Sequence, residues 1–234
     1  MFGSEPRACE NVIVTGCVLR SACNAVRIGP HGDGPIRDCV LSDLVMDARV
    51  ELSLHVYAAM PQRLKDTIYD NVTGPQIENI QARNLSIRAR ESPFYCQVFP
   101  DSRPPAGIRD VSCSGLQIYG PGAVSLTGSA ALPMERIELS DVVMHADTPP
   151  EPLLAAVPEP IGCLASEVCR RIPHAFYLRH VRDARLRGVR VHWPAGGPAG
   201  RTALMVEQSQ DVSAEGIGNG YLTKPPSHKG GSHA

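Results

Sequence analysis

Two carboxylates in this sequence could act together as an acid and a base. Inverting cleavage of a glycosidic bond needs one carboxyl group to protonate the leaving oxygen and a second to activate water on the other side. Asp33 and Glu51 could form such a couple, although the separation that decides the mechanism does not follow from sequence. The alternative, which we favour, is that Asp33 is a turn residue in Gly-Asp-Gly and that Glu51 is a solvated glutamate on a strand.

Three basic side chains could take part in the same chemistry. Arg27 could hold a sugar carboxylate through its planar guanidinium or act as the proton acceptor of a lyase, but we expect it to pair with Glu51. His31 and His55 could be general bases or ligands, but they share no fixed spacing. The chain has no C-x-x-C pair, which argues against a structural zinc site. We predict no metal and no cofactor.

The elements that must position these side chains are short strands, because one apolar pattern recurs along the chain. An apolar residue is followed by another two positions later, a third after three more, and a fourth after two more, as in Cys39, Leu41, Leu44 and Met46. Alternation indicates a strand with one buried face, and the three-residue step marks a corner. The copies begin at Val12, Cys39, Ile80, Val111, Ile137, Ala184 and Val212. Such a repeat predicts an all-β fold, a single-stranded parallel β-helix of about seven coils, rather than a β-sandwich.

A third strand follows the copies and carries the candidate binding residues. These strands are expected at 24–29, 49–56, 92–99 and 122–128, with weaker patterns at 152–157 and 174–179. Parallel strands stack about 4.8 Å apart, so their outward side chains would form one continuous polar face. That face could be a polysaccharide groove or an ordinary solvated β-surface. The candidate substrate-binding residues on it and in its flanking loop are Asn24, Arg27, His31, Glu51, Ser53, His55, Tyr95 and Gln97.

Composition indicates one soluble domain. The chain has 234 residues, is 43% hydrophobic and carries a formal net charge of -1, which argues against nucleic acid as the main partner. It has no apolar run of about 18 residues and no signal peptide, so we predict no membrane contact and, if Met1 is the true start, a cytoplasmic location. We expect a single domain over 1–222 and a disordered tail over 223–234.

Cysteines and one insertion complete the expectations. Cys17, Cys39 and Cys113 occupy inward positions of the repeat, where cysteine acts as a small hydrophobe. The longest insertion, 145–173, is Pro-rich at first, with a short helix expected around 166–171. Cys163 and Cys169 lie on it and could form a disulfide.

The stretch CENVIVTGCVLRSACNAVRIGPHGDGPIRDCVLSDLVM resembles the repeat region of glycoside hydrolase family 28, the polygalacturonase-like enzymes. Later residues, LRHVRDARLRGVRVHW, are similar to the closing coils of those proteins. The resemblance covers most of residues 8–220 at the level of coil pattern and implies a right-handed β-helix, inversion and hydrolysis of galacturonan or a related glycan. The family's D-D, N-x-D and G-H-G motifs do not occur, and Gly29 stands where R-x-K would place lysine after Arg27.

Three functions remain open from the sequence. The first is a hydrolase acting on pectic or other acidic polysaccharide. The second is a carbohydrate-binding or self-associating β-helix without catalysis, since the family aspartates are missing. The third is a polysaccharide lyase. Because a β-helix end presents unpaired backbone and apolar side chains, we also expect a homodimer through the first coil, Val12–Ile28.

Overall fold

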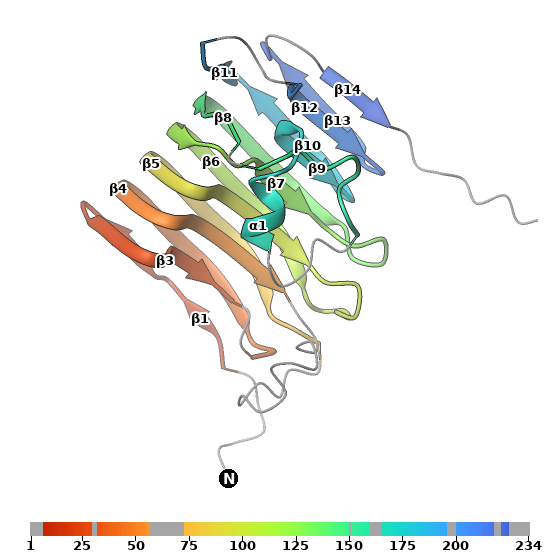
Figure 1. Cartoon of the computed structure of the whole chain (residues 1–234). Helices are drawn as coiled ribbons and strands as arrows, with labels where there is room; N and C mark the ends of the chain where they lie inside the picture. The colour runs from red at the N-terminus through yellow and green to blue at the C-terminus, as the bar shows by residue number, and fades with distance from the viewer. Residues whose placement is uncertain are drawn as a thin grey trace, which may run out of the picture.

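Parallel strands dominate the molecule (Figure 1). The computed structural model describes residues 7–29, 32–56, 73–149, 151–159, 165–195, 200–217 and 221–224. The strands form one 14-stranded sheet, solenoid-like and barrel-shaped, in which every described pairing is parallel. Within these ranges, no helix has the length and apolar character to cross a membrane.

The strands differ widely in length because the longest ones continue through a corner from one part of the sheet to the next. The first eight are β1 (Cys9–Glu10), β2 (Ile13–Thr15), β3 (Val18–Ile28), β4 (Pro35–Val56), β5 (Gln76–Val98), β6 (Gly107–Gly120), β7 (Val124–Thr127) and β8 (Met134–Ala146). After the helix α1 (Ala165–Cys169) come β9 (His174–Arg179), β10 (Val181–Arg187), β11 (Arg190–His192), β12 (Thr202–Glu207), β13 (Gln210–Glu215) and β14 (Tyr221–Lys224).

The strand segments stack into three parts of the sheet, which we call face 1, face 2 and face 3. Face 1 comprises the segments 9–15, 36–42, 77–83, 108–114, 134–140, 181–187 and 210–215. Face 2 comprises 18–21, 44–48, 85–88, 116–120, 142–146 and 190–192. Face 3 comprises 24–28, 50–56, 92–98, 124–127, 174–179, 202–207 and 221–224.

The first residues of the repeat copies lie in register on face 1, as the sequence pattern predicts. The backbone N–H of Val40 donates to Val12 O at 2.8 Å. From there, pairing runs through successive strands: Cys39 with Ile80, Ile80 with Val111, Val111 with Ile137, Ile137 with Ala184, and Ala184 with Val212. The repeat read from the sequence is therefore the repeat of the structure.

The three-residue step of the pattern is a corner between faces 1 and 2. A residue with positive φ stands there in each copy: Gly16, Asp43, Asn84, Gly115, Asp141, Gly188 and Gly216. Glycine adopts this backbone without strain, and Asn and Asp tolerate it better than other residues. Asn84 also donates from Nδ2 to Asp43 Oδ1 at 2.6 Å, which links adjacent corners.

Inward side chains form one apolar core along the sheet. Alternation along the third strands predicts eight inward side chains: Val26, Ile28, Leu52, Leu54, Cys96, Val98, Val124 and Leu126. Val26 and Ile28 are partly buried and pack against the core, and the other six are buried in it. Cys39 and Cys113 are buried in the same core, and Cys17 packs against it. Since these cysteines replace aliphatic side chains, the disposition expected for them is confirmed.

Some sequence expectations fail in the second half of the chain. Residues 152–157 are not a strand, because the prolines around them cannot donate to a sheet ladder. The expected helix is present as α1, but Cys169 is a free thiol, so no disulfide joins it to Cys163, which lies outside the described residues. Thr223 and Lys224, the first two residues of the expected tail, belong to β14 and pair with Val206 and Glu207. Residues 225–234 of the expected tail lie outside the described ranges.

Candidate functional site

The structure brings most of the predicted binding residues together on face 3. Strand register places Arg27 beside Ser53, Ser53 beside Tyr95, and His55 beside Gln97. Asn24 donates from Nδ2 to Ser53 Oγ at 2.8 Å. The rings of His55 and Tyr95 meet edge to face, with centroids 4.9 Å apart. The period of two along the third strands is sufficient to predict this alignment.

These side chains nevertheless do not form an open groove. Glu51 and Ser53 are 0% exposed, Gln97 is 2% exposed and Tyr95 is 7% exposed. Only Arg27 is exposed, and Asn24 is half-buried. This part of face 3 is therefore neither an open polysaccharide groove nor a solvated surface, the two alternatives that the sequence left open.

Part of the insertion covers the outer side of face 3. Residues of α1 and the turn after it pack on the sheet in a second apolar cluster: Val50, Tyr95, Ala123, Ala165, Cys169, Ile172 and Tyr177. Figure 1 shows α1 lying against the sheet. Polar contacts hold it there, since Ala123 N–H donates to Cys169 O at 3.0 Å and Glu91 pairs with both Arg49 and Arg170. The apolar cluster explains why this insertion is a fixed layer of the fold.

Glu51 lies at the start of face 3 and is not the solvated strand residue we expected. Its Oε1 accepts a 2.6 Å hydrogen bond from the backbone N–H of Ala48, where the pairing of β4 with β5 shifts register. Its Oε2 is buried without a hydrogen-bond partner. Burial is the main cause that raises the pKa of Glu51 from 4.5 to about 7. The expected ion pair with Arg27 is wrong, because register sets Arg27 beside Ser53 and the Glu51 carboxyl is turned to Ala48.

Asp33 is a turn residue, as the Gly-Asp-Gly context suggests. Its Oδ1 accepts hydrogen bonds from the backbone N–H groups of Thr73 and Gly74 at 2.9 and 2.7 Å. The Glu51 carboxyl is instead buried and turned to the backbone of Ala48. Each carboxylate is thus held by backbone groups of a different segment, which does not favour an acid/base couple of Asp33 and Glu51.

The missing lysine of R-x-K has a structural reason. Gly29 has a φ of 77°, and a Cβ at this position would lie 2.2 Å from the carbonyl oxygen of His55. No lysine fits there without moving β4, so Arg27 stands without the partner that the family motif would supply.

His55 is a poor candidate for a general base on this face. Burial, followed by the positive charge of Arg27, lowers the pKa of His55 from 6.5 to about 3. His55 is only 4% exposed, so its neutral ring is a packing element beside Tyr95. His31 lies outside the described residues.

An open groove lies instead on the outer side of face 1, where sequence analysis placed no site. Its volume is about 490 Å³. Its lining is mostly polar and comes from β5, β6, β8 and β10: Asn79, Gln81, Asp110, Val111, Ser112, Arg136, Ile137, Glu138, Asp183 and Arg185. Val111 and Ile137 are buried in the core at the base of the groove, and the other lining residues are the polar positions around them in the repeat. The same alternation that identified face 3 could therefore have pointed here.

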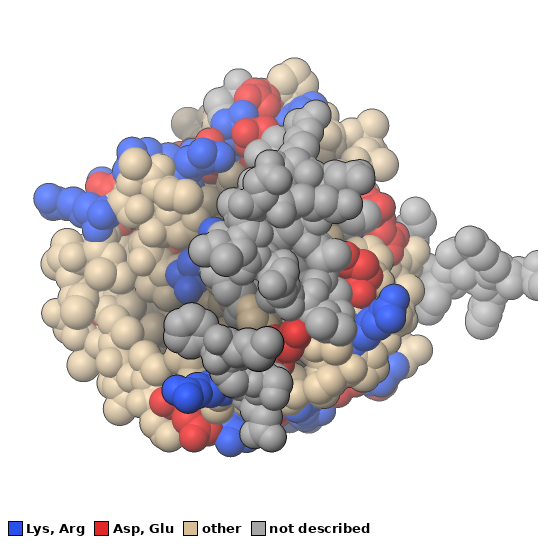
Figure 2. All heavy atoms as spheres, turned by 90° about the horizontal axis from the view of Figure 1, so that it is seen from below, with Lys and Arg blue, Asp and Glu red and all other residues tan. Residues whose placement is uncertain are grey.

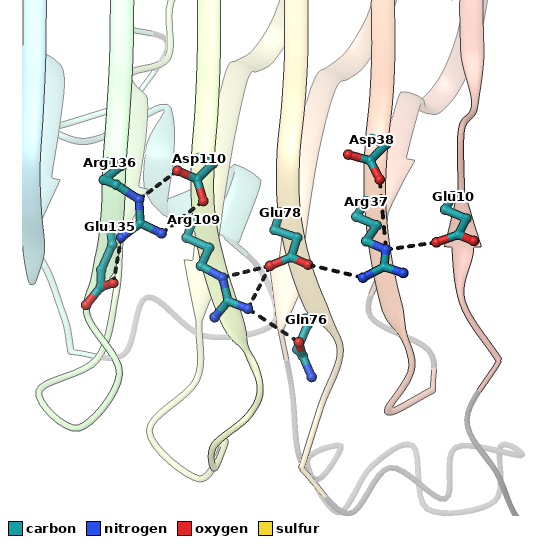
Figure 3. A network of polar contacts seen from close by, with 9 residues as sticks. All are labelled: Glu10, Arg37, Asp38, Gln76, Glu78, Arg109, Asp110, Glu135 and Arg136. Atoms are coloured by element: carbon teal, nitrogen blue, oxygen red, sulfur yellow. Dashed lines mark hydrogen bonds and ion pairs between the residues drawn. The ribbon is translucent and has the colours of Figure 1, made fainter.

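Charged side chains pair across the strands beside this groove (Figure 3). Arg37 on β4 contacts Glu10 on β1 at 2.8 Å and reaches toward Glu78 on β5 at 3.9 Å. Arg109 on β6 contacts Glu78 at 2.6 Å. Opposite charges thus alternate from strand to strand, at the spacing that a parallel ladder sets.

The same alternation continues into the groove. Arg136 Nε and Nη2 donate to the two carboxylate oxygens of Asp110 at 2.6 and 2.9 Å. The hydrogen bond from Arg136 lowers the pKa of Asp110 below its usual range. Arg185 is 65% exposed and only loosely paired with Asp183, at 3.7 Å. Arg185 is therefore the cation of the groove best placed to meet a ligand.

Charge is mixed elsewhere as well. Figure 2 shows basic and acidic side chains interspersed around the described part of the molecule seen from below. Among the residues that the structure describes, no group of three or more His, Cys, Asp or Glu side chains could hold a metal ion. Comparison of the chain with protein-family models, with curated proteins and with solved structures gave no match.

Proposed function

We propose that this chain is a right-handed, single-stranded parallel β-helix of about seven coils that binds an acidic oligo- or polysaccharide without cleaving it. The groove on face 1 is the observation that carries this proposal. It is open, about 490 Å³ in volume, and lined by amide, hydroxyl, carboxylate and guanidinium groups. The resemblance of the coil pattern to glycoside hydrolase family 28 supports an acidic glycan as the ligand.

The groove side chains suit an extended ligand of this kind. Gln81 and Ser112 pair in register on neighbouring strands, so their polar groups can meet successive hydroxyls along a chain. Arg185 offers a planar set of donors that matches a sugar carboxylate. Acid groups in the groove give neighbouring hydroxyls an acceptor.

The carboxyls argue for binding over catalysis. Inversion needs a protonated acid on one side of the bond and a base on the other. Asp110 in the groove is held ionised by Arg136, which makes it a poor proton donor. Glu51 has the raised pKa that an acid needs, but it is fully buried on face 3. We therefore propose neither a hydrolase nor a lyase.

Calorimetric titration with oligogalacturonides tests the proposal. We expect saturable binding by the wild type and at least about tenfold weaker binding by Arg185→Ala, as expected for loss of a charge-assisted hydrogen bond. Arg190→Ala is the matched control, because Arg190 is an exposed arginine on face 2. Reducing ends and ultraviolet-absorbing unsaturated products are measured in the same samples. Turnover, or binding that Arg185→Ala leaves unchanged, would overturn the proposal.

Exposed apolar side chains favour a second role, the association of two copies through the first coil. Ile13 is 69% exposed, Val18 66% and Val45 49%. In the described chain, β1, β2 and β3 pair with β4 alone, so each has one open edge. The open edge of a second copy supplies the donors, acceptors and apolar surface that such an edge lacks.

Light scattering at increasing concentration tests this association. We expect a dimer whose formation is weakened by Val18→Ser and unchanged by Tyr119→Ser, a substitution of an exposed side chain further along face 2. A monomer at every concentration would contradict it.

A further inference from the structure

Two buried donors near the C-terminal strands have no acceptor. Arg201 precedes β12 and is 4% exposed, and Trp193 follows β11 and is half-buried. The guanidinium carbon of Arg201 lies 5.5 Å from the centroid of the Trp193 ring. Arg201 Nε and Trp193 Nε1 are both buried, and neither has a hydrogen-bond partner among the residues that the structure describes.

Arg201 has weaker hydrogen bonds than Arg179, a strongly buried arginine on face 3. Arg179 donates to the carbonyls of Val157 and Pro158 at 2.8 and 2.9 Å, and pairs with the Glu207 carboxylate at 3.2 Å. Within the described ranges, Arg201 donates to the carbonyls of Asp147 and His174, at 3.3 and 3.5 Å. Both distances exceed the usual range for a strong bond of this type. In the described chain no carboxylate pairs with Arg201.

Burying the charged guanidinium of Arg201 without a neighbouring anion costs free energy. A buried guanidinium loses its hydration, and only an opposite charge or well-formed hydrogen bonds restore it. Burial lowers the pKa of Arg201 to about 10, and no acid acts in the other direction. Tryptophan Nε1 is a donor only, so an acceptor is the group that satisfies it.

We infer that Arg201 and Trp193 form a binding site for a small oxyanion, which accepts hydrogen bonds from Arg201 Nε and Trp193 Nε1. Guanidinium groups match carboxylate and phosphate oxygens equally well in geometry. The shared chemistry is thus an oxyanion, supplied by inorganic phosphate or by the carboxylate of an acidic molecule. Neither residue lines the groove on face 1, so this inference can fail while the proposed function holds, and the reverse.

Trp193 is the single tryptophan of the chain, so its fluorescence reports on the site directly. We titrate the full chain with inorganic phosphate, acetate and galacturonate in turn, keeping ionic strength constant with sodium chloride. A saturable change in Trp193 fluorescence is expected with at least one oxyanion, and the stronger response identifies phosphate or carboxylate as the source. Arg201→Met should weaken it at least tenfold, whereas Arg190→Met should leave it unchanged. No saturable change with any of the three, or an equal response of Arg201→Met, would overturn the inference.

If Arg201→Met does not fold, a milder variant, Trp193→Phe, tests the same site. Trp193→Phe keeps an aromatic ring under the guanidinium but removes the N–H donor. A ligand that binds the folded state raises the melting temperature by mass action. The bound oxyanion should therefore raise the melting temperature of the wild type more than that of Trp193→Phe. Equal increases in both proteins would count against the site.

Discussion

The outer sides of face 1 and face 3 carry the same alternation and have opposite environments. On face 1, Arg136 and Asp110 pair in solvent with side chains 46% and 43% exposed. On face 3, the corresponding outward residues Ser53 and Ser125 are 0% exposed, and Tyr177 packs under the insertion. The covering insertion, rather than the strands, therefore decides which face can meet a ligand.

The comparison also separates two kinds of polar residue. The charges of face 1 remain solvated, so their pairing contributes little to stability and leaves them available to a ligand. Some polar groups of face 3 are buried and joined by hydrogen bonds between neighbouring strands, as Asn24 is to Ser53. Buried polar groups of this second kind specify packing, and each one left unpaired carries a cost.

The largest effect should come from breaking the contact between the insertion and face 3. Tyr177 is fully buried, and its hydroxyl donates to Glu207 at 2.7 Å. We expect Tyr177→Ala to lower the free energy of unfolding by about 3–5 kcal/mol, since it removes a buried ring. Denaturant unfolding measures this, with Tyr119→Ala, at an exposed ring on face 2, expected to cost less than about 1 kcal/mol. Equal losses in the two variants would show that the insertion does not pack as described.

A pH-dependent effect should distinguish Glu51 from the solvated carboxylates of face 1. Its folded-state pKa of about 7 lies above the ordinary 4.5, so the folded state binds the proton more tightly. Its contribution is therefore fully present below about pH 4.5 and falls as pH rises through 7. Glu51→Gln should be more stable than wild type at pH 8 by an amount on the order of 3 kcal/mol, with the advantage shrinking toward pH 5.

Measuring the difference between the two proteins isolates Glu51 from the buried histidines, whose lowered pKa values act in the opposite direction. Glu138→Gln, at a carboxylate on exposed face 1, is measured in parallel as the control. A flat difference between wild type and Glu51→Gln from pH 5 to pH 8 would rule out a buried carboxyl at this position.

The smallest effect should come from the ladder on face 1. Asp110→Asn removes the charge that Arg136 contacts, but both side chains are well exposed. We expect a loss below about 1 kcal/mol at neutral pH, because solvent and salt screen such pairs. The Asp110 pKa is lowered in the folded state, so this contribution is present above its unfolded pKa and disappears as the pH falls through the folded value. A loss of several kcal/mol would mean that face 1 is as buried as face 3.

The sequence predicts the repeat far better than it predicts the site. The period of two and the corner step establish the register from Cys39 to Val212, because each copy must bury the same side chains. The alternation is the same on a covered face and on an open one, so it cannot show that Glu51 is buried and Arg185 exposed. That difference depends on contacts between Cys169 and Ala123, which are distant in sequence.

The most direct test of the central claim is carbodiimide labelling of carboxyl groups with and without an oligogalacturonide. The account predicts that Glu138 and Asp183 are labelled in the free protein and protected by the glycan. Glu51 should remain unlabelled in both states. Labelling of Glu51 in the free protein, or glycan protection on face 3 with none in the groove, would contradict the assignment of face 1 as the binding surface.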